Sequence, residues 1–331
     1  MTETEFDAPD SVQDAQQDDG LTTGATTAGQ TEGDTNLSVF RAAWDDSRDE
    51  ATRRLLEEDA GLFLHQSLST PCLDAITSSD GIYLTTVDGR KIMDFHGNSV
   101  HQLGYGHPRV IAAVEEQLRL LPFSPRRYTN RSAIELARAL ASLAPGDLHR
   151  VLFAPGGAEA VSMALKLARL ATGRHKTVSM WGSFHGGTLD TISLGGQSDF
   201  RVGMGPLMTG TEHVPPVEPA RCPWKCGVIC DLSCAEYVEY VLDREGDVAA
   251  VVSETVRNTP HFPPREYWQI VRAACDRHGA LLILDEIPTG LGRTGTMFAF
   301  EHYGIVPDIA VLGKGLGGGV FPLAAVIARE H

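Results

Sequence analysis

The pattern of apolar and polar positions changes along the chain, and from about residue 100 onward it becomes regular. Short β-branched runs alternate with stretches of about ten to fifteen residues whose apolar positions recur at helical spacing. This order predicts an α/β fold with a largely parallel sheet flanked by helices on both faces. The predicted strands are 150–154 (a buried strand), 176–181, 249–254, 280–286 and 308–312, with one more beginning near Ala325. The predicted helices are 108–121, 131–143, 158–171, 235–244 and 265–278.

Three patterns precede this region. Residues 53–64 have the spacing of an amphipathic helix, and residues 81–95 alternate around a central Asp-Gly pair, which is typical of a β-hairpin. Residues 1–38 contain few large apolar side chains, so they cannot bury enough surface to offset the entropy lost on ordering. We therefore expect residues 1–38 to be a disordered acidic tail.

The charge of the chain excludes some partners. The formal net charge is −15, and residues 1–50 alone carry 13 Asp and Glu against 2 Arg. Nucleic-acid binding needs clustered Lys and Arg, so we expect no nucleic-acid partner. The chain has no apolar run of about 18 residues and no apolar signal segment at its start, so we expect no membrane span and a cytoplasmic location.

Four of the six cysteines recur at a strict four-residue interval: Cys222, Cys226, Cys230 and Cys234. A disulfide framework is disfavoured in a cytosolic chain. Four thiolates suit zinc or iron, but the close Cys-x-x-Cys pairs of most such sites are absent here. We favour a reduced structural loop and assign no metal ligand; a metal centre is the alternative.

Candidate chemistry gathers where predicted strands end, which is the edge at which open α/β sheets bind ligands. Gly156-Gly157-Ala158 leads from a strand into a helix, so the backbone N–H groups of Gly157 and Ala158 can form a phosphate site; a simple tight turn is the alternative. Phe184 follows another strand and can stack on a flat ring, although a core aromatic would have the same pattern.

Two further strand ends carry ionisable residues. Asp285 and Glu286 close an apolar strand, where carboxylates without partners are costly to bury. We expect Asp285 to face a pyridine nitrogen, with solvated carboxylates as the alternative. Lys314 ends another apolar strand among glycines, where desolvation would lower its pKa and favour the neutral amine that forms imines; a surface lysine is the alternative.

Together these motifs resemble the class III (ω-amino acid) aminotransferases, which are fold-type I enzymes dependent on pyridoxal 5'-phosphate (PLP). The resemblance begins near Phe95 and is strongest in Asp285-Glu-Ile-Pro-Thr-Gly-Leu-Gly-Arg-Thr-Gly and Leu312-Gly-Lys-Gly-Leu-Gly-Gly-Gly. It implies that residues 101–331 are a PLP-binding large domain and residues 39–100 the N-terminal segment of a smaller α+β domain. Family members continue for roughly a hundred residues more, so we expect the small domain to be incomplete and these residues alone to have weak or no activity.

The resemblance also implies roles for individual residues. Lys314 would hold PLP as a Schiff base and Asp285 would face the pyridine nitrogen of PLP, so these two are the expected catalytic residues. The expected activity is transfer of an amino group between an amine or amino acid and a keto acid, in a homodimer with shared active sites. The residues expected to bind the cofactor are Gly157, Ala158, Phe184, His185, Asp285 and Lys314.

Departures from the family pattern indicate a second possible reaction. Ala158 lacks the usual hydroxyl, Pro288 replaces a common Gln, and Ser253-Glu-Thr-Val-Arg replaces a common Glu-Pro segment. This last change places Arg257 near the expected substrate pocket, where Arg257 and Arg127, with Arg126, can clamp a carboxylate or phosphonate; ordinary surface arginines are the alternative.

These changes resemble a branch of the family that performs eliminations, such as the ammonia-lyase that acts on hydroxylated 2-aminoethylphosphonate. Such an ammonia-lyase is therefore the alternative to amino transfer. A non-catalytic, metal-binding relative is a third possibility, and the presence of both Lys314 and Asp285 disfavours it.

Overall fold

The computed structural model describes residues 39–64, 72–125, 127–226, 230–257 and 261–330, and the chain divides into two compact units, 1–75 and 76–331. The expected tail, 1–38, lies outside the described residues. The first unit contains helices α2 (Val39–Asp46) and α3 (Glu50–Leu62). Helix α3 begins before the predicted residue 53 because the Asp49 carboxylate caps it, accepting a hydrogen bond from Thr52 N at 3.0 Å.

The second unit opens with a three-stranded antiparallel sheet of β1 (Ile76–Asp80), β2 (Tyr83–Thr86) and β3 (Lys91–Met93). The predicted hairpin is confirmed in β2 and β3. Gly89 lies in the turn with a φ of 84°, a conformation that glycine adopts without strain. The predicted boundary between small and large domains near residue 100 stays a prediction.

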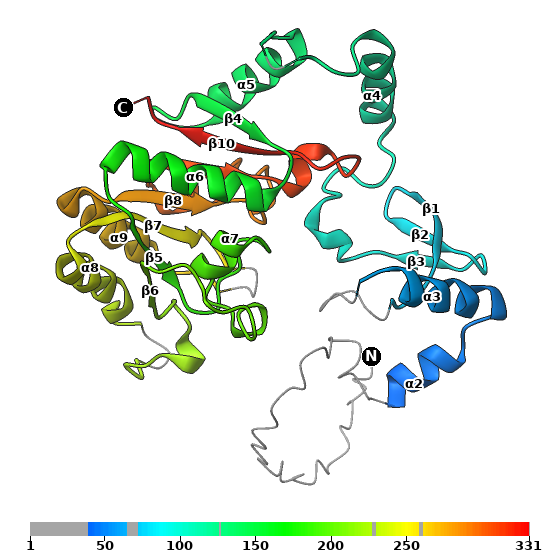
Figure 1. Cartoon of the computed structure of the whole chain (residues 1–331), viewed down its shortest axis with the longest axis horizontal. Coiled ribbons are helices and arrows are strands. Elements are labelled where there is room, and N and C mark those ends of the chain that lie inside the picture. The colour runs from blue at the N-terminus through cyan, green and yellow to red at the C-terminus, as the bar shows by residue number, and fades with distance from the viewer. Residues whose placement is uncertain (1–38, 65–71, 126, 227–229, 258–260, 331) are drawn as a thin grey trace, which may run out of the picture. The chain divides into compact units, whose positions relative to one another are not determined.

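A seven-stranded sheet forms the centre of the second unit, in the order β4-β10-β9-β8-β7-β5-β6 (Figure 1). Neighbouring strands from β6 to β9 pair in parallel, whereas β10 is antiparallel to both β9 and β4. The predicted α/β fold with a largely parallel sheet is therefore confirmed. The strands are β4 (Arg150–Ala154), β5 (Lys176–Met180), β6 (Thr211–Val214), β7 (Val248–Glu254), β8 (Leu281–Asp285), β9 (Ile309–Leu312) and β10 (Ala324–Ala328).

Helices pack on both faces of this sheet. Helix α6 contacts β4, β7, β8, β9 and β10, while α8, α9 and α5 contact strands from the opposite side (Figure 1). Short 3₁₀ helices occupy several connections. The α-helices are α4 (Pro108–Leu120), α5 (Arg131–Leu143), α6 (Gly157–Thr172), α7 (Leu189–Leu194), α8 (Ser233–Glu245) and α9 (Arg265–His278). The 3₁₀ helices are η1 (Gly97–Ser99), η2 (Ser198–Phe200), η3 (Pro219–Arg221), η4 (Ala299–Tyr303) and η5 (Lys314–Gly317).

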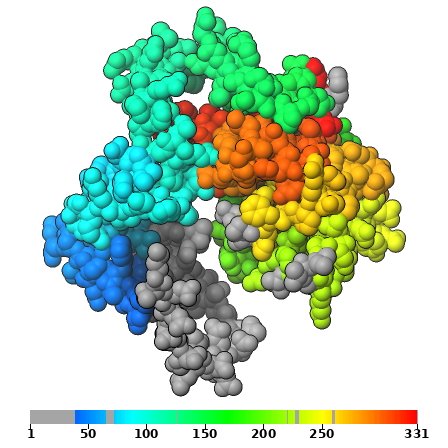
Figure 2. Space-filling view, turned by 180° about the vertical axis from the view of Figure 1, so that it is seen from behind, coloured from blue at the N-terminus to red at the C-terminus, as the bar shows by residue number. Residues whose placement is uncertain are grey.

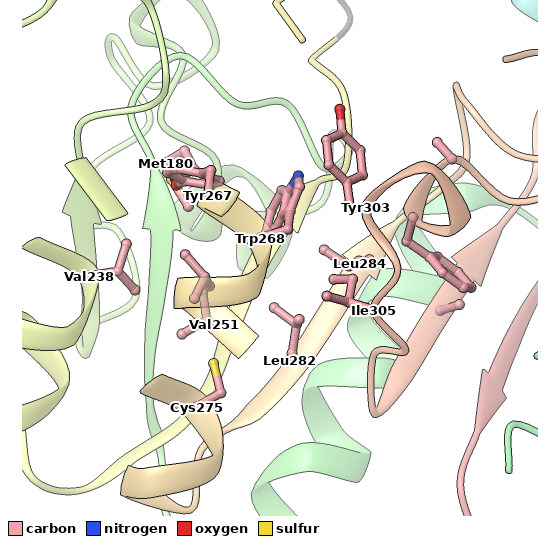
Figure 3. Packing of buried hydrophobic residues seen from close by; sticks show 14 of the residues in the cluster. Met180, Val238, Val251, Tyr267, Trp268, Cys275, Leu282, Leu284, Tyr303 and Ile305 are labelled. Atoms are coloured by element: carbon pink, nitrogen blue, oxygen red, sulfur yellow. The ribbon is translucent and has the colours of Figure 1, made fainter. Parts of the chain in front are cut away.

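The central strands bury side chains on both faces, which explains their continuous apolar runs. On β8, Leu282 and Leu284 join the core beneath α8 and α9, whereas Ile283 between them joins the core beneath α6. Figure 3 shows Trp268 of α9 near Leu282 and Leu284, and Val238 of α8 facing Val251. In the view from behind, the residues of α9 and η4 (yellow to orange) lie at the surface (Figure 2).

Strand β4 corrects one prediction. Residues 150–154 were expected to be a buried strand, but β4 is an edge strand: Leu152 is 51% exposed and only Ala154 is buried. An apolar run does not distinguish an edge strand from a central one, because strand order depends on contacts distant in sequence. The short elements β6 and α7 were not predicted, since four and six residues carry little periodicity.

Glu286, just after β8, ties the central strands to the chain that follows. Its buried carboxylate accepts hydrogen bonds from Thr255 Oγ1 at 2.5 Å, Thr289 Oγ1 at 3.1 Å, and the backbone N–H groups of Ala299 and Phe300 at 2.9 and 3.1 Å. Burial nevertheless raises the pKa of Glu286 above its usual range. One side chain therefore joins the end of β7 to the start of η4.

Among the described residues, no helix is both long and apolar enough to span a membrane.

We expect Glu286→Ala to lower the free energy of unfolding by at least about 3 kcal/mol, because each buried donor left without a partner costs about 1–3 kcal/mol. The measurement is the urea midpoint and its slope, followed by circular dichroism. The control is Glu135→Ala on the exposed face of α5, which should change stability by less than about 0.5 kcal/mol. Equal effects of the two substitutions would contradict the role of Glu286.

Candidate active site

The functional candidates lie at the carboxyl ends of four adjacent strands. Phe184 and His185 follow β5, Glu254 ends β7, Asp285 ends β8, and Lys314 comes two residues after β9. Because β5, β7, β8 and β9 are neighbours and run parallel, these ends lie along one edge of the sheet. This edge is where an open α/β sheet positions ligands.

A buried pair of side chains forms the centre of the site. The Asp285 carboxylate and the His185 ring, each 2% exposed, lie 2.8 Å apart from Oδ2 to Nδ1. Burial opposes protonation of His185, but the hydrogen bond and charge of Asp285, together with the charge of Glu254, raise the pKa of the imidazole. Asp285 also accepts a hydrogen bond from Ile287 N at 3.1 Å. The alternative of solvated carboxylates at this strand end is wrong, because both Asp285 and Glu286 are buried with partners.

Lys314 lies close to this pair. Its backbone has a φ of 47°, a left-handed conformation that strains a residue with a side chain by about 1–2 kcal/mol. Burial lowers the pKa of the Lys314 amine, although the charges of Asp285 and Glu254 act in the opposite direction. The structure thus gives Lys314 the desolvated setting that was expected, and it favours the neutral amine.

The N-terminus of α6 lies beside the same strand ends. A Cβ on Gly157 would come within 2.9 Å of Ile287 Cδ1, and a Cβ on Gly186 would come within 2.6 Å of Ala158 Cβ. Gly157 and Ala158 therefore contact the segments that carry Asp285 and His185. The cap residue, Gly156, makes no side-chain cap bond, so the first backbone N–H groups of α6 are available to an anion without the hydroxyl that the family usually has.

Phe184 is 41% exposed, and its ring centroid lies 4.6 Å from that of Phe200. The alternative of a core aromatic is therefore wrong, and part of the ring remains accessible to a ligand.

Pro288, which stands where a Gln is common, is buried and offers no amide side chain.

A cavity of about 910 Å³ opens at the ends of β5, β6 and β7, where Trp181 and Gly182 line it directly after β5; His185, Asp285 and Lys314 are not among its lining residues. Arg257 lines it and is held by two contacts, Nη2 to Gly182 O at 2.9 Å and Nη1 to Glu218 Oε2 at 3.3 Å. Arg257 thus lies at a cavity wall, and its role as a substrate residue stays a prediction. The other positively charged or ionisable side chains that line the cavity include Arg201, Arg221 and His261.

Arg127, another expected substrate residue, is not among the side chains that line this cavity. Arg127 is exposed in the connection between α4 and α5, and among the described residues nothing joins it to Arg257 or Lys314. Arg126 lies outside the described residues.

Two residues of the site were not predicted. Glu254 is 5% exposed and acts on the pKa of both Lys314 and His185, and Glu218 holds Arg257. Glu254 had the same signal as Asp285, a carboxylate that closes an apolar strand. The role of Glu218 has no sequence signal, because it depends on a contact with a residue 39 positions away.

Comparison with known proteins agrees with this geometry. The class-III aminotransferase family matches residues 65–331. The (R)-1-hydroxy-2-aminoethylphosphonate ammonia-lyase of Vibrio splendidus is 47% identical over 314 residues, which cover 90% of this chain and 66% of that protein. The acetylornithine aminotransferase of Methanopyrus kandleri is 39% identical over 261 residues, covering 76% of this chain and 62% of that protein. The chain thus spans about two thirds of the length of these relatives or less.

Solved structures share the fold. The taurine:2-oxoglutarate aminotransferase of Bifidobacterium kashiwanohense, in complex with PLP and glutamate, has a TM-score of 0.77 and 28% identity, and the match covers 86% of this chain and 66% of that one. A PLP-bound amine transaminase from an uncultivated Pseudomonas species has a TM-score of 0.75 and 30% identity, with 81% and 65% covered.

These matches confirm the resemblance that the motifs around Asp285 and Lys314 indicated. The cofactor that the family and its PLP-bound structures indicate is pyridoxal 5'-phosphate. The chain belongs to the class-III aminotransferase family.

Proposed function

We propose that this protein is a PLP-dependent ammonia-lyase that acts on a small amine carrying a hydroxyl group and a phosphonate. The observations that carry this proposal are the buried Asp285–His185 pair with a desolvated Lys314 at the strand ends, and Arg257 on the wall of the cavity at the ends of β5, β6 and β7. The choice of elimination over amino transfer is supported by similarity. The Vibrio lyase matches 90% of this chain at 47% identity, whereas the acetylornithine aminotransferase matches 76% at 39%.

The residues present fit PLP. His185 Nε2 is buried without a hydrogen-bond partner among the described residues, while its Nδ1 is taken by Asp285. We propose that Asp285, oriented by His185, binds the pyridine nitrogen and that the accessible part of Phe184 packs on the ring. The N–H groups at Gly157 and Ala158 would bind the phosphate, with the positive end of the α6 dipole behind them. When bound, PLP supplies an aldehyde carbon that links to amines and a ring that withdraws electrons from them.

Lys314 has two tasks in this proposal. Its neutral Nζ would hold the cofactor, and when free it would accept a proton from the carbon that bears the substrate amine. Burial supports both tasks because a protonated amine can neither attack a carbonyl carbon nor accept a proton. Asp285 and Glu254 keep negative charge nearby, which stabilises Lys314 after it has accepted the proton.

Arg257 would recognise the anionic end of the substrate. A guanidinium binds a phosphonate through two parallel charge-assisted hydrogen bonds. In this structure Glu218 accepts a hydrogen bond from the Arg257 guanidinium, so the substrate anion would compete with a carboxylate that already neutralises Arg257. We infer that binding strengthens with the charge of the substrate, because a dianion competes better than a monoanion for the same guanidinium.

Amino transfer is the second candidate. It is supported by the matching aminotransferases, among them the putrescine aminotransferase of Pectobacterium atrosepticum at 38% identity over 75% of this chain and 52% of that protein. Both reactions begin with proton removal from the amine-bearing carbon. They differ afterwards, since the lyase loses the neighbouring hydroxyl and releases ammonia, whereas the aminotransferase needs a keto acid acceptor.

We further propose a homodimer and a cytoplasmic location. Large apolar side chains that stay exposed in the second unit support association, among them Leu103, Leu120 and Phe123. Light scattering at several protein concentrations tests the dimer.

The lowered pKa of Lys314 predicts its reactivity in cofactor-free protein. Amines react with acetic anhydride only when neutral, so Lys314 should label at lower pH than an amine with the ordinary value of 10.5. Lys176 is the internal reference, because the hydrogen bonds that its ammonium donates to Asp247 and Glu245 raise its pKa and should delay its labelling to higher pH. Mass spectrometry of labelled peptides across a pH series gives, for each of the two lysines, the midpoint pH at which half of the amine is labelled. A midpoint for Lys314 above that of Lys176 would contradict the assignment.

Lys314→Ala should abolish the absorbance of enzyme-bound cofactor and lower the rate of ammonia release by at least about 10³-fold, because both tasks of Nζ are lost. In a version extended to the length of the relatives, the unsubstituted protein should release ammonia from 1-hydroxy-2-aminoethylphosphonate without any keto acid. Dependence on a keto acid would establish amino transfer instead, and a protein that never binds PLP would refute both candidates.

Arg257→Gln should raise KM for the phosphonate substrate about tenfold or more, since a charge-assisted hydrogen bond contributes about 1.5–3 kcal/mol. KM for an amino alcohol without the phosphonate should stay nearly unchanged. Arg244→Gln, on the exposed part of α8, is the matched control. Unchanged KM for the phosphonate in Arg257→Gln would rule out this role for Arg257.

A further inference from the structure

The four regularly spaced cysteines lie together in the structure, outside the residues assigned to catalysis. Cys226 Sγ lies 3.2 Å from Cys222 Sγ, in the geometry of a thiol that donates a hydrogen bond. Cys230 lies close enough to Cys226 and Cys234 to raise the pKa of both thiols. All four are free thiols, and only Cys234 is buried. Among the described residues, no group of three or more His, Cys, Asp or Glu side chains converges as a metal site would.

The turn between Cys222 and Cys226 brings their sulfurs together. Lys225 N donates to Cys222 O at 3.0 Å, and Lys225 has a φ of 55°, so the chain reverses within these five residues. A disulfide bond is about 2.0 Å long, so the two sulfurs need to approach by only about 1 Å. Both side chains are partly exposed, and a small reagent can therefore reach them.

The two thiols differ in character. Backbone N–H groups, led by that of Cys226, and the Cys226 thiol itself donate hydrogen bonds to the sulfur of Cys222, which lowers the pKa of Cys222. Cys226 is the donor in the shared bond, and this raises its pKa to about 11. Cys222 is thus the better nucleophile and Cys226 the second thiol of the pair.

We propose that Cys222 and Cys226 are a reversible redox pair that closes to a disulfide. In the first step, the Cys222 thiolate attacks one sulfur of a low-molecular-weight disulfide and displaces one thiolate, which leaves a mixed disulfide on Cys222. Cys226 then loses its proton and attacks the sulfur of Cys222, displacing the second small thiolate. Two protein thiols are oxidised by two electrons, and the small disulfide is reduced to two thiols. A reversible, exposed pair of this kind is the type of disulfide found in reducing compartments.

The pair also acts on the cavity wall, an inference that rests on the proposed function. Arg221 and Pro223, the two neighbours of Cys222, both line the cavity. Arg221 Nε lies 3.6 Å from Glu218 Oε1, and the other oxygen of the same carboxylate forms the ion pair with Arg257. Closing the disulfide displaces the backbone at Cys222 and with it the charges around Arg257, so we expect oxidation to change KM for the anionic substrate.

Peptide mapping without reduction tests the pair directly. The whole protein is equilibrated with glutathione and glutathione disulfide at a series of ratios, remaining thiols are alkylated, and the protein is digested with trypsin. Cleavage after Lys225 separates Cys222 from the other three cysteines, so the disulfide appears as two linked peptides, with a loss of two of the six free thiols. Fragmentation of the linked peptides should identify Cys226 as the partner of Cys222.

Cys222→Ser and Cys226→Ser should each abolish the linked peptides, whereas Cys72→Ser, outside the cluster, should leave them unchanged. Reduction should restore all six thiols, and KM measured in both states tests the effect on the cavity. Absence of the 222–226 disulfide at every ratio would overturn the proposal, as would stoichiometric zinc bound through these cysteines. Neither result depends on turnover, so the pair can fail while the lyase stands, and the lyase can fail while the pair stands.

Discussion

The burial of two adjacent carboxylates at the end of β8 is the constraint on which the rest of this structure depends. Asp285 and Glu286 end a strand with apolar cores on both sides, so each needs its own set of donors. Successive side chains of a strand point to opposite faces, and the two carboxylates accordingly reach different partners. Asp285 meets His185 after β5, whereas Glu286 meets Thr255 after β7 and the backbone N–H groups that begin η4.

Because their partners differ, Glu286 stabilises the fold while Asp285 belongs to the candidate active site. Glu286 is fully engaged by hydrogen bonds and holds the ends of β7 and β8 together. Asp285 keeps its place through His185 and Ile287 N, next to the desolvated amine of Lys314. Thr255, in the segment that replaces the common Glu-Pro pattern, donates its hydroxyl to Glu286, and two residues later Arg257 reaches the cavity. The departure from the family pattern thus alters both the support of the site and its proposed substrate wall.

Most of the fold was predictable because the elements that form its core are long and strongly patterned. The helix at Arg131–Leu143 was predicted to the residue, and the central strands were predicted to within one or two residues. The strand at Arg150–Ala154 was predicted at the right place but with the wrong burial, since position in a sheet depends on which strands become neighbours. The short elements β6 and α7 went unpredicted because tertiary packing, and not periodicity, supports them.

The amino-acid sequence by itself determined the class of fold and the family, and it predicted Lys314 and Asp285 as the residues that act on the cofactor. It could do so because strand ends, glycine-rich turns and isolated ionisable residues are local signals. Only the tertiary structure decided which side chains meet: His185 with Asp285, Glu254 near Lys314, Glu218 with Arg257, and Cys222 with Cys226. The first three pairs join segments far apart in the chain, and the last depends on a turn at Lys225. Such contacts depend on strand order and backbone direction, and these cannot be predicted from the spacing of residues in the sequence.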